Sequence, residues 1–295
     1  MFTHLVLSGG GLAGTAYIGA LARLQEHPGK DDIRHVIGTS IGALMGFLFV
    51  LRINMLEVQA YVRANWLTPE MLEIGDATCL LNLLNDCGVV RGDRYLAFMK
   101  HFLRRALGVT DITFVELTKA TGMVLTICVT DLIDACAHYF SVDKTPDVSV
   151  LSALAASMAV PLFFVPVEIN GRSYVDGAVT ANFPIDAVNK DIIPDAVIGM
   201  HIVAAKKSYV SPTASLANLM QSLLGALLNL NHLEQVLRRY KNIVVMDRCP
   251  VPNFPMEVSE AGVMAFRITE SDVAASYAYG YSVMDSMLTG LSSRT

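Results

Sequence analysis

Residues 38–42 form the sequence G-T-S-I-G, directly after a short β-branched segment at 33–37. Glycine at both outer positions allows the close backbone approach that a sharp strand-to-helix turn requires. The residues after the turn, 43–50, are apolar and contain no proline, as a buried helix should be. The pattern therefore predicts a strand, a tight turn and a helix, with the Ser40 hydroxyl presented at the turn as a candidate nucleophile.

The first fifty residues alternate between expected strands and expected helices. A strand at 5–7 leads into a glycine loop and a helix at 15–26, and the strand at 33–37 leads into the helix after Ser40. This order favours a parallel sheet covered by helices. We also expect strands at 123–130, 137–142, 196–203 and 243–246, helices at 150–159, 216–233 and 271–288, a mostly helical region at 54–120 and an irregular insertion at 75–92.

These elements predict one α/β domain over residues 1–295, with a largely parallel central sheet and helices on both faces (α/β/α). The chain has 295 residues, 53% of them hydrophobic, which is enough to bury a sizeable core. Its net charge of −5 argues against nucleic acid as a partner and against electrostatic attraction to anionic lipid. Any membrane contact is therefore expected to be mainly hydrophobic.

No segment predicts a membrane span or a secretory signal. The best apolar segment, 41–51, is too short to cross hydrocarbon, and the N-terminus enters an apolar strand at once. We therefore expect an intracellular protein that can bind membranes peripherally. The five cysteines are scattered, the histidines have no metal-ligand spacing and no EF-hand loop is present. These patterns predict no bound metal, no cofactor and no calcium requirement.

The glycine loop at 9–14, G-G-G-L-A-G, fits two chemistries. It matches the G-x-G-x-x-G pattern that binds a dinucleotide pyrophosphate, and it also fits a loop whose N–H groups stabilise an oxyanion. A dinucleotide site needs an acid at the end of the next strand. Asp31 and Asp32 precede that strand, and the Ser40 turn stands at its end. The oxyanion interpretation is therefore favoured, and the nicotinamide-cofactor alternative is disfavoured.

Asp176 begins a D-G-A segment, which in isolation indicates only a surface turn. Its neighbours change this interpretation. The segment A-S-M-A-V-P at 156–161 precedes it, and N-F-P at 182–184 follows it.

With these four motifs in this order, the chain resembles the patatin-like phospholipases over about residues 5–190. The resemblance implies a serine–aspartate dyad, in which Ser40 is the nucleophile and Asp176 is the general base, with no histidine between them. It implies an oxyanion hole lined by Gly9, Gly10 and Gly11. The remaining motif positions are Gly14, Gly38, Gly42, Gly177 and Ala178.

The function that the resemblance implies is calcium-independent hydrolysis of carboxylic esters in phospholipids, lysophospholipids or acylglycerols, through an acyl-enzyme. The partner would be a lipid substrate, met at a membrane or micelle surface. The chain departs from the family at two positions of the loop, which often begins with aspartate and often carries a basic residue before its last glycine. Here these positions are Ser8 and Ala13. Loss of the cation at Ala13 bears on rate or headgroup preference more than on the chemistry.

Several alternatives stay open at this point. The same dyad would serve a lipid acyltransferase, and the same scaffold would serve a catalytically silent lipid-binding effector. His201 follows Asp176 in the chain and is the alternative base of a conventional serine hydrolase. The uncharged helix at 216–233 is either a core helix or an apolar rim that contacts lipid. Headgroup preference, oligomeric state and any need for an activator are not encoded in recognisable motifs.

Overall fold

The computed structural model describes residues 1–65, 73–74, 87–90, 92–203, 233–251, 256–258, 264–266 and 268–292. All of the helix expected at 216–233 except Leu233, and most of the insertion expected at 75–92, lie outside these residues. An eight-stranded sheet forms the centre, in the order β11-β10-β1-β2-β5-β9-β8, with β6 also paired to β5. Its strands are β1 (His4–Leu7), β2 (His35–Thr39), β5 (Val124–Asp131), β6 (Cys136–Phe140), β8 (Val167–Ile169), β9 (Arg172–Asp176), β10 (Val197–Ile202) and β11 (Ile243–Met246).

The sheet has a parallel part and an antiparallel part. Strands β11, β10, β1, β2 and β5 are parallel to one another, as the alternation of strands and helices predicted. Strands β6, β8 and β9 pair antiparallel. The six strands expected from the sequence are all present with ends shifted by one or two residues. The short strands β8 and β9 of the central sheet were not predicted, because three and five residues carry too little alternation to be recognised.

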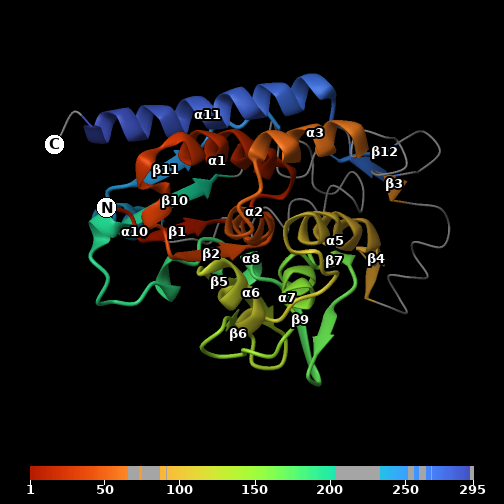
Figure 1. Cartoon of the computed structure of the whole chain (residues 1–295). Helices are drawn as coiled ribbons and strands as arrows, with labels where there is room; N and C mark the ends of the chain where they lie inside the picture. The colour runs from red at the N-terminus through yellow and green to blue at the C-terminus, as the bar shows by residue number, and fades with distance from the viewer. Residues whose placement is uncertain are drawn as a thin grey trace.

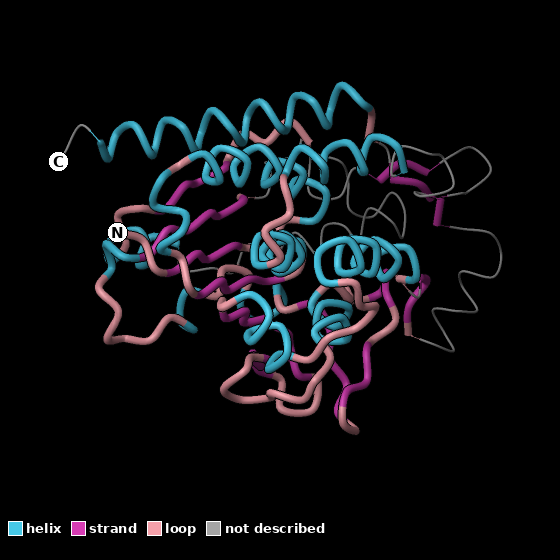
Figure 2. The backbone as a smooth tube through the Cα atoms, in the orientation of Figure 1, coloured by secondary structure: helices cyan, strands magenta, loops and turns pink. Residues whose placement is uncertain are grey.

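Helices cover both faces of the sheet (Figures 1 and 2). They are α1 (Ala16–Glu26), α2 (Ile41–Val50), α3 (Met55–Asn65), α5 (Asp93–Leu107), α6 (Phe114–Thr121), α7 (Val150–Ser157), α8 (Ala178–Ala181), α10 (Leu233–Arg239) and α11 (Glu270–Ser292). Short strands lie outside the central sheet: β4 (Gly88–Val90) pairs with β7 (Leu162–Phe164), and β12 (Met256–Val258), β13 (Met264–Phe266) and β3 (Glu73–Ile74) form a third sheet.

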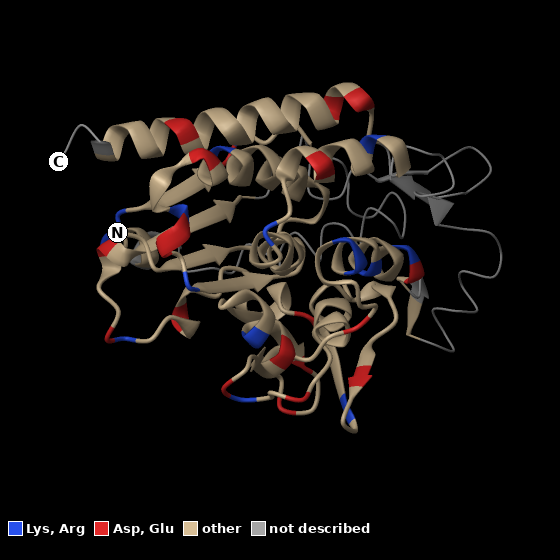
Figure 3. Ribbon diagram, viewed as in Figure 1, with Lys and Arg blue, Asp and Glu red and all other residues tan. Residues whose placement is uncertain are grey.

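The core lies on both faces of the sheet. On β1, Leu5 and Leu7 belong to the large core that includes α1 and α2, whereas Val6 packs in a smaller cluster with Phe183 and Tyr240. Parallel strands that are buried on both faces carry apolar residues almost continuously. Strands β1, β2, β10 and β11 accordingly contain no Lys, Arg, Asp or Glu, and Figure 3 shows these charges on the surrounding helices and loops. Among the described helices, none combines the length and apolar character that a membrane crossing requires.

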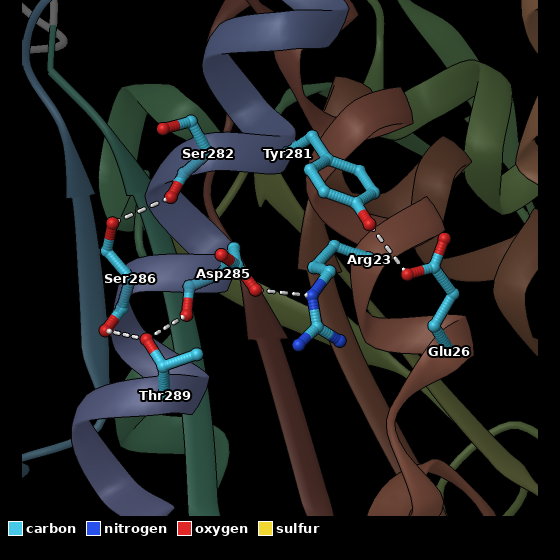
Figure 4. Close-up of polar contacts among 7 residues, drawn as sticks. All are labelled: Arg23, Glu26, Tyr281, Ser282, Asp285, Ser286 and Thr289. Atoms are coloured by element: carbon cyan, nitrogen blue, oxygen red, sulfur yellow. Dashed lines mark hydrogen bonds and ion pairs between the residues drawn. The ribbon is translucent and has the colours of Figure 1, made fainter.

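Helices α1 and α11 pack unusually closely, because each presents a glycine to the other. A Cβ on Gly280 would collide with the carbonyl oxygen of Ala16, and a Cβ on Gly19 would collide with that of Tyr277. Polar contacts along the same seam are drawn in Figure 4: Arg23 forms an ion pair with Asp285 at 2.7 Å, and the Tyr281 hydroxyl donates to Glu26 at 2.7 Å. These contacts attach the last helix to the first.

We expect Gly280→Ala to destabilise the protein. The added methyl meets backbone that cannot rotate away, so the helices must separate, at a cost of about 1–3 kcal/mol. This cost exceeds the gain of alanine over glycine in a helix, which is about 1 kcal/mol. Urea unfolding measures the difference. The matched control is Gly290→Ala on the same helix, where a Cβ meets no described atom within 4 Å and stability should be unchanged or slightly higher. Equal stabilities of the two variants would contradict the packing described here.

Candidate active site

Ser40 lies at a strained turn between β2 and α2. Its backbone has φ 53° and ψ −128°, in a region that non-glycine residues rarely adopt. A Cβ on Gly38 would lie 2.6 Å from the backbone of Ala43, and a Cβ on Gly42 would collide with the Ser8 carbonyl. Both glycines are therefore required by close approach of backbone. The strand–turn–helix predicted from residues 38–42 is confirmed, and Ser40 stands immediately before the positive end of the α2 dipole.

A second serine holds the turn in place. The backbone N–H of Ser40 donates to the Ser157 Oγ at 2.8 Å, and the Ser157 hydroxyl donates to the Cys128 carbonyl at 2.6 Å. Ser157 is fully buried at the end of α7, so these two hydrogen bonds link α7, the turn and β5. Ser157 belongs to the A-S-M-A-V-P motif, but the sequence alone predicted no role for it. The one feature that could have indicated a role is its hydroxyl at the end of a helix made of small and apolar residues.

The register of the sheet brings Asp176 to Ser40. Strand β6 pairs with one edge of β5 over residues 127–131. Strands β2 and β9 share the other edge, where β2 pairs as far as Cys128 and β9 pairs from Val129 onward. Because β2 runs towards this point and the antiparallel β9 runs back to it, their last residues, Thr39 and Asp176, meet end to end. The serine that follows β2 therefore lies beside the aspartate that ends β9.

The two side chains are joined by a short hydrogen bond. The Ser40 hydroxyl donates to Asp176 Oδ2 at 2.6 Å, and the N–H of Ala178 donates to Oδ1 at 2.8 Å. Asp176 is 2% exposed and Ser40 is 6% exposed. Burial raises the pKa of Asp176 to about 7, against the opposing effect of these two hydrogen bonds. A carboxylate with this pKa is a far better base at neutral pH than an ordinary aspartate.

The glycine loop lies against the same serine. Gly14 packs on the side chain of Ile41, the residue after the nucleophile, and Gly11 has φ 53°. The Gly9 N–H donates to the Asn182 carbonyl at 3.0 Å, so it is already occupied. The N–H groups of Gly10 and Gly11 make no hydrogen bond to the described residues. The oxyanion role of the loop stays a prediction, and these two groups are the donors open to a ligand.

The remaining motif positions support this arrangement. A Cβ on Gly177 would collide with the Cys128 carbonyl, so the segment after Asp176 can approach β5 only as glycine. Ala178 supplies the N–H to the carboxylate. Ala13 is buried, and its carbonyl accepts from the Cys249 thiol at 3.2 Å. A basic side chain at Ala13 would therefore have to be accommodated in the interior.

His201 is not joined to Ser40. It packs edge-to-face on Phe183 at 5.2 Å between ring centroids, and burial lowers its pKa to about 4. The Ser40 hydroxyl donates to Asp176 instead. Within the described ranges, no group of three or more His, Cys, Asp or Glu side chains is placed to hold a metal ion.

A small apolar cavity of about 20 Å³ opens beside the loop and the turn. Its lining includes Gly11 of the loop, Ile41 and Leu44 of α2, and Val62 and Phe98 from α3 and α5. A cavity of this size has room for about one water molecule, so it is a small apolar hollow beside the loop and not a site for an acyl chain.

Comparison with known proteins gives a consistent result. The family model described as patatin-like phospholipase matches residues 5–189. A protein of Invertebrate iridescent virus 6 named probable lipid hydrolase 463L is 29% identical over 193 residues, which is 64% of this chain and 64% of that protein. An uncharacterized protein of Acanthamoeba polyphaga mimivirus is 26% identical over 205 residues, 67% of this chain and 64% of the relative. The matched part thus spans less than two thirds of both viral proteins.

Among solved structures, VipD from Legionella pneumophila superposes with a TM-score of 0.61 over 98% of this chain and 67% of its own, at 18% sequence identity. At this identity the likeness establishes the fold alone.

Proposed function

The chain belongs to the patatin-like phospholipase family, and we propose that it is a lipid acyl hydrolase in which Ser40 and Asp176 form the catalytic dyad. The observation that carries the proposal is the 2.6 Å hydrogen bond from the Ser40 hydroxyl to a buried carboxylate. The match to the family model and the name of the iridescent virus relative both favour a lipid over a polar ester.

The reaction follows from the geometry in two halves. In the first, Ser40 Oγ attacks the ester carbonyl while Asp176 takes its proton, and the carbonyl oxygen becomes an oxyanion that accepts from Gly10 and Gly11. The protonated Asp176 then donates to the leaving alcohol as the ester bond breaks. In the second half, Asp176 takes a proton from water, the resulting hydroxide attacks the acyl-enzyme, and the fatty acid is released with Ser40 reprotonated.

Fatty-acid release from mixed micelles tests the proposal. Purified protein is incubated with phospholipid, lysophospholipid and acylglycerol in the presence of EDTA, and the products are identified by mass spectrometry. We expect free fatty acid from at least one class, at a rate that added calcium does not change. Transfer of the acyl group to a second lipid would identify a transacylase on the same dyad. A protein that forms neither product would contradict the proposal.

The pH dependence of the reaction should report the pKa of Asp176. The carboxyl must be ionised to accept the serine proton, so kcat/KM should rise with pH through about 7 and level off above it. An ordinary aspartate, with a pKa near 3.8, would give a flat profile over the same range. The measurement is an initial-rate profile between pH 5 and 9 on a neutral lipid substrate, whose own charge does not change. A flat profile would contradict the assignment of Asp176 as a base with a raised pKa.

A further inference from the structure

One buried polar group beside the nucleophile has no hydrogen-bond partner in the part of the chain that the structure describes. Asn182 follows α8 directly and is 5% exposed, yet its Oδ1 makes no hydrogen bond to any described residue. A buried amide oxygen without a partner costs about 1–3 kcal/mol, and such groups usually have a functional reason. The amide oxygen is the orphaned atom, since Nδ2 is not one of the buried polar atoms that lack a partner.

The position of this amide is informative. The point at which a Cβ on Gly9 would stand lies 2.5 Å from Asn182 Oδ1 and 3.3 Å from Ser40 Cβ. The amide and the nucleophile therefore flank the same spot, on the side of the glycine loop. The backbone carbonyl of Asn182 meanwhile accepts the Gly9 N–H at 3.0 Å. One residue thus occupies a donor of the loop with its backbone and brings a new amide group to the same place with its side chain.

We propose that the side-chain amide of Asn182 is an additional oxyanion donor, which replaces the Gly9 N–H that its own backbone occupies. The amide oxygen and nitrogen have nearly the same shape, so a half-turn of the group presents Nδ2–H where Oδ1 now lies. This N–H donates to the former carbonyl oxygen of the ester when Ser40 has attacked, together with Gly10 and Gly11. The inference rests on the proposed hydrolase function and adds a third donor to it.

Asn182→Leu tests the proposal, because leucine has the same number and branching of side-chain heavy atoms as asparagine and removes both its donor and its acceptor. The backbone carbonyl that holds Gly9 is retained. Loss of one oxyanion donor lowers kcat by about 10²–10³-fold, and we expect this loss with little change in KM. Thermal stability should change little, since relief of an unpaired buried polar group offsets the larger volume of leucine. A purely structural role predicts the opposite combination, with kcat retained.

A tetrahedral analogue separates transition-state binding from ground-state binding. Ser40 adds to the carbonyl of a long-chain alkyl trifluoromethyl ketone, and the adduct carries an oxyanion in the site. The product fatty acid forms no such adduct. Its affinity should fall by about 10²-fold in Asn182→Leu, while fatty-acid affinity stays unchanged. The matched control is Asn189→Leu, at an exposed residue whose Oδ1 already accepts from the backbone N–H of Asp191. If the leucine variant does not fold, Asn182→Asp keeps the shape and should show the same loss at a pH at which its carboxyl is ionised, since an ionised carboxylate cannot donate.

The outcomes distinguish this inference from the function on which it rests. In one outcome, the wild-type protein hydrolyses lipid and binds the ketone while Asn182→Leu stays within threefold of it in both kcat and ketone affinity. This result overturns the role of Asn182 alone. A wild-type protein that does neither overturns the hydrolase proposal and this inference with it. Loss of kcat and of ketone affinity in Asn182→Leu, with Asn189→Leu unchanged, supports both.

Discussion

Ser40→Ala should lower lipid hydrolysis by about 10⁵–10⁶-fold, to the level of the uncatalysed reaction plus whatever binding contributes. Without Oγ no acyl-enzyme can form, and no other hydroxyl among the described residues donates to Asp176 Oδ2. The fold should persist, because alanine keeps the Cβ and the backbone N–H that donates to Ser157. The measurement is the initial rate of fatty-acid release at high protein concentration, with thermal unfolding recorded alongside.

The control for this variant is Ser152→Ala, five residues before Ser157 on α7 and outside the turn. It should retain wild-type activity. If purified Ser40→Ala released fatty acid at more than about one hundredth of the wild-type rate, the nucleophile would be a different residue.

Asp176→Asn should lower kcat by about 10²–10⁴-fold, the usual contribution of a general base. Asparagine has nearly the same shape and accepts the Ala178 N–H through its oxygen, so the loss would come from the missing base and not from a displaced turn. The Ser40 nucleophile would remain in place. Retention of more than a tenth of the activity would indicate a different base, with His201 the first candidate.

The same substitution should stabilise the protein at alkaline pH. Folding raises the pKa of Asp176 from its ordinary value of 3.8 to about 7, so the folded state holds this proton more tightly than the unfolded state does. Stability therefore falls as pH rises from about 4 to 7, by at most about 4 kcal/mol. Asparagine carries no charge and avoids this cost, with an expected net gain of about 1–3 kcal/mol at pH 8.

Urea unfolding at pH 8 and at pH 5 checks this expectation. The advantage of Asp176→Asn should be large at pH 8 and much smaller at pH 5, where the folded wild type is already protonated. Asp191→Asn, an exposed carboxylate on the following loop, serves as the control and should change stability little at either pH. A wild type that is more stable than Asp176→Asn at pH 8 would contradict the account of a desolvated carboxylate.

The contiguous features of the fold followed from the sequence. Strands β1, β2, β5, β10 and β11 are short apolar segments between turn residues, and the turn at Ser40 carries its own glycines. The antiparallel approach of β9 was not predictable in this way. Asp176 is 136 positions from Ser40, and its place depends on which edge of β5 is free to pair, which no local pattern encodes. The resemblance to a family, and not the spacing, linked the two residues.

The details of the site needed three-dimensional contacts. The resemblance implied an oxyanion hole lined by Gly9, Gly10 and Gly11, and the chain folds so that the Asn182 carbonyl accepts the N–H of the first of these glycines. The support that Ser157 gives to the turn likewise depends on α7 ending beside Cys128, far away in the sequence. In both cases the sequence identified the residue as part of a motif, but it did not identify the residue that it contacts.

The most direct test of the account is to identify the residue that a long-chain alkyl fluorophosphonate modifies. The reagent phosphonylates an activated serine irreversibly, so peptide mapping of the inactivated protein locates the nucleophile whichever lipid is the true substrate. The account predicts one label per chain, on the peptide that contains Ser40, with hydrolysis lost in proportion to labelling and with Asp176→Asn labelled far more slowly. A label on another residue, or full hydrolysis by protein labelled at Ser40, would contradict it.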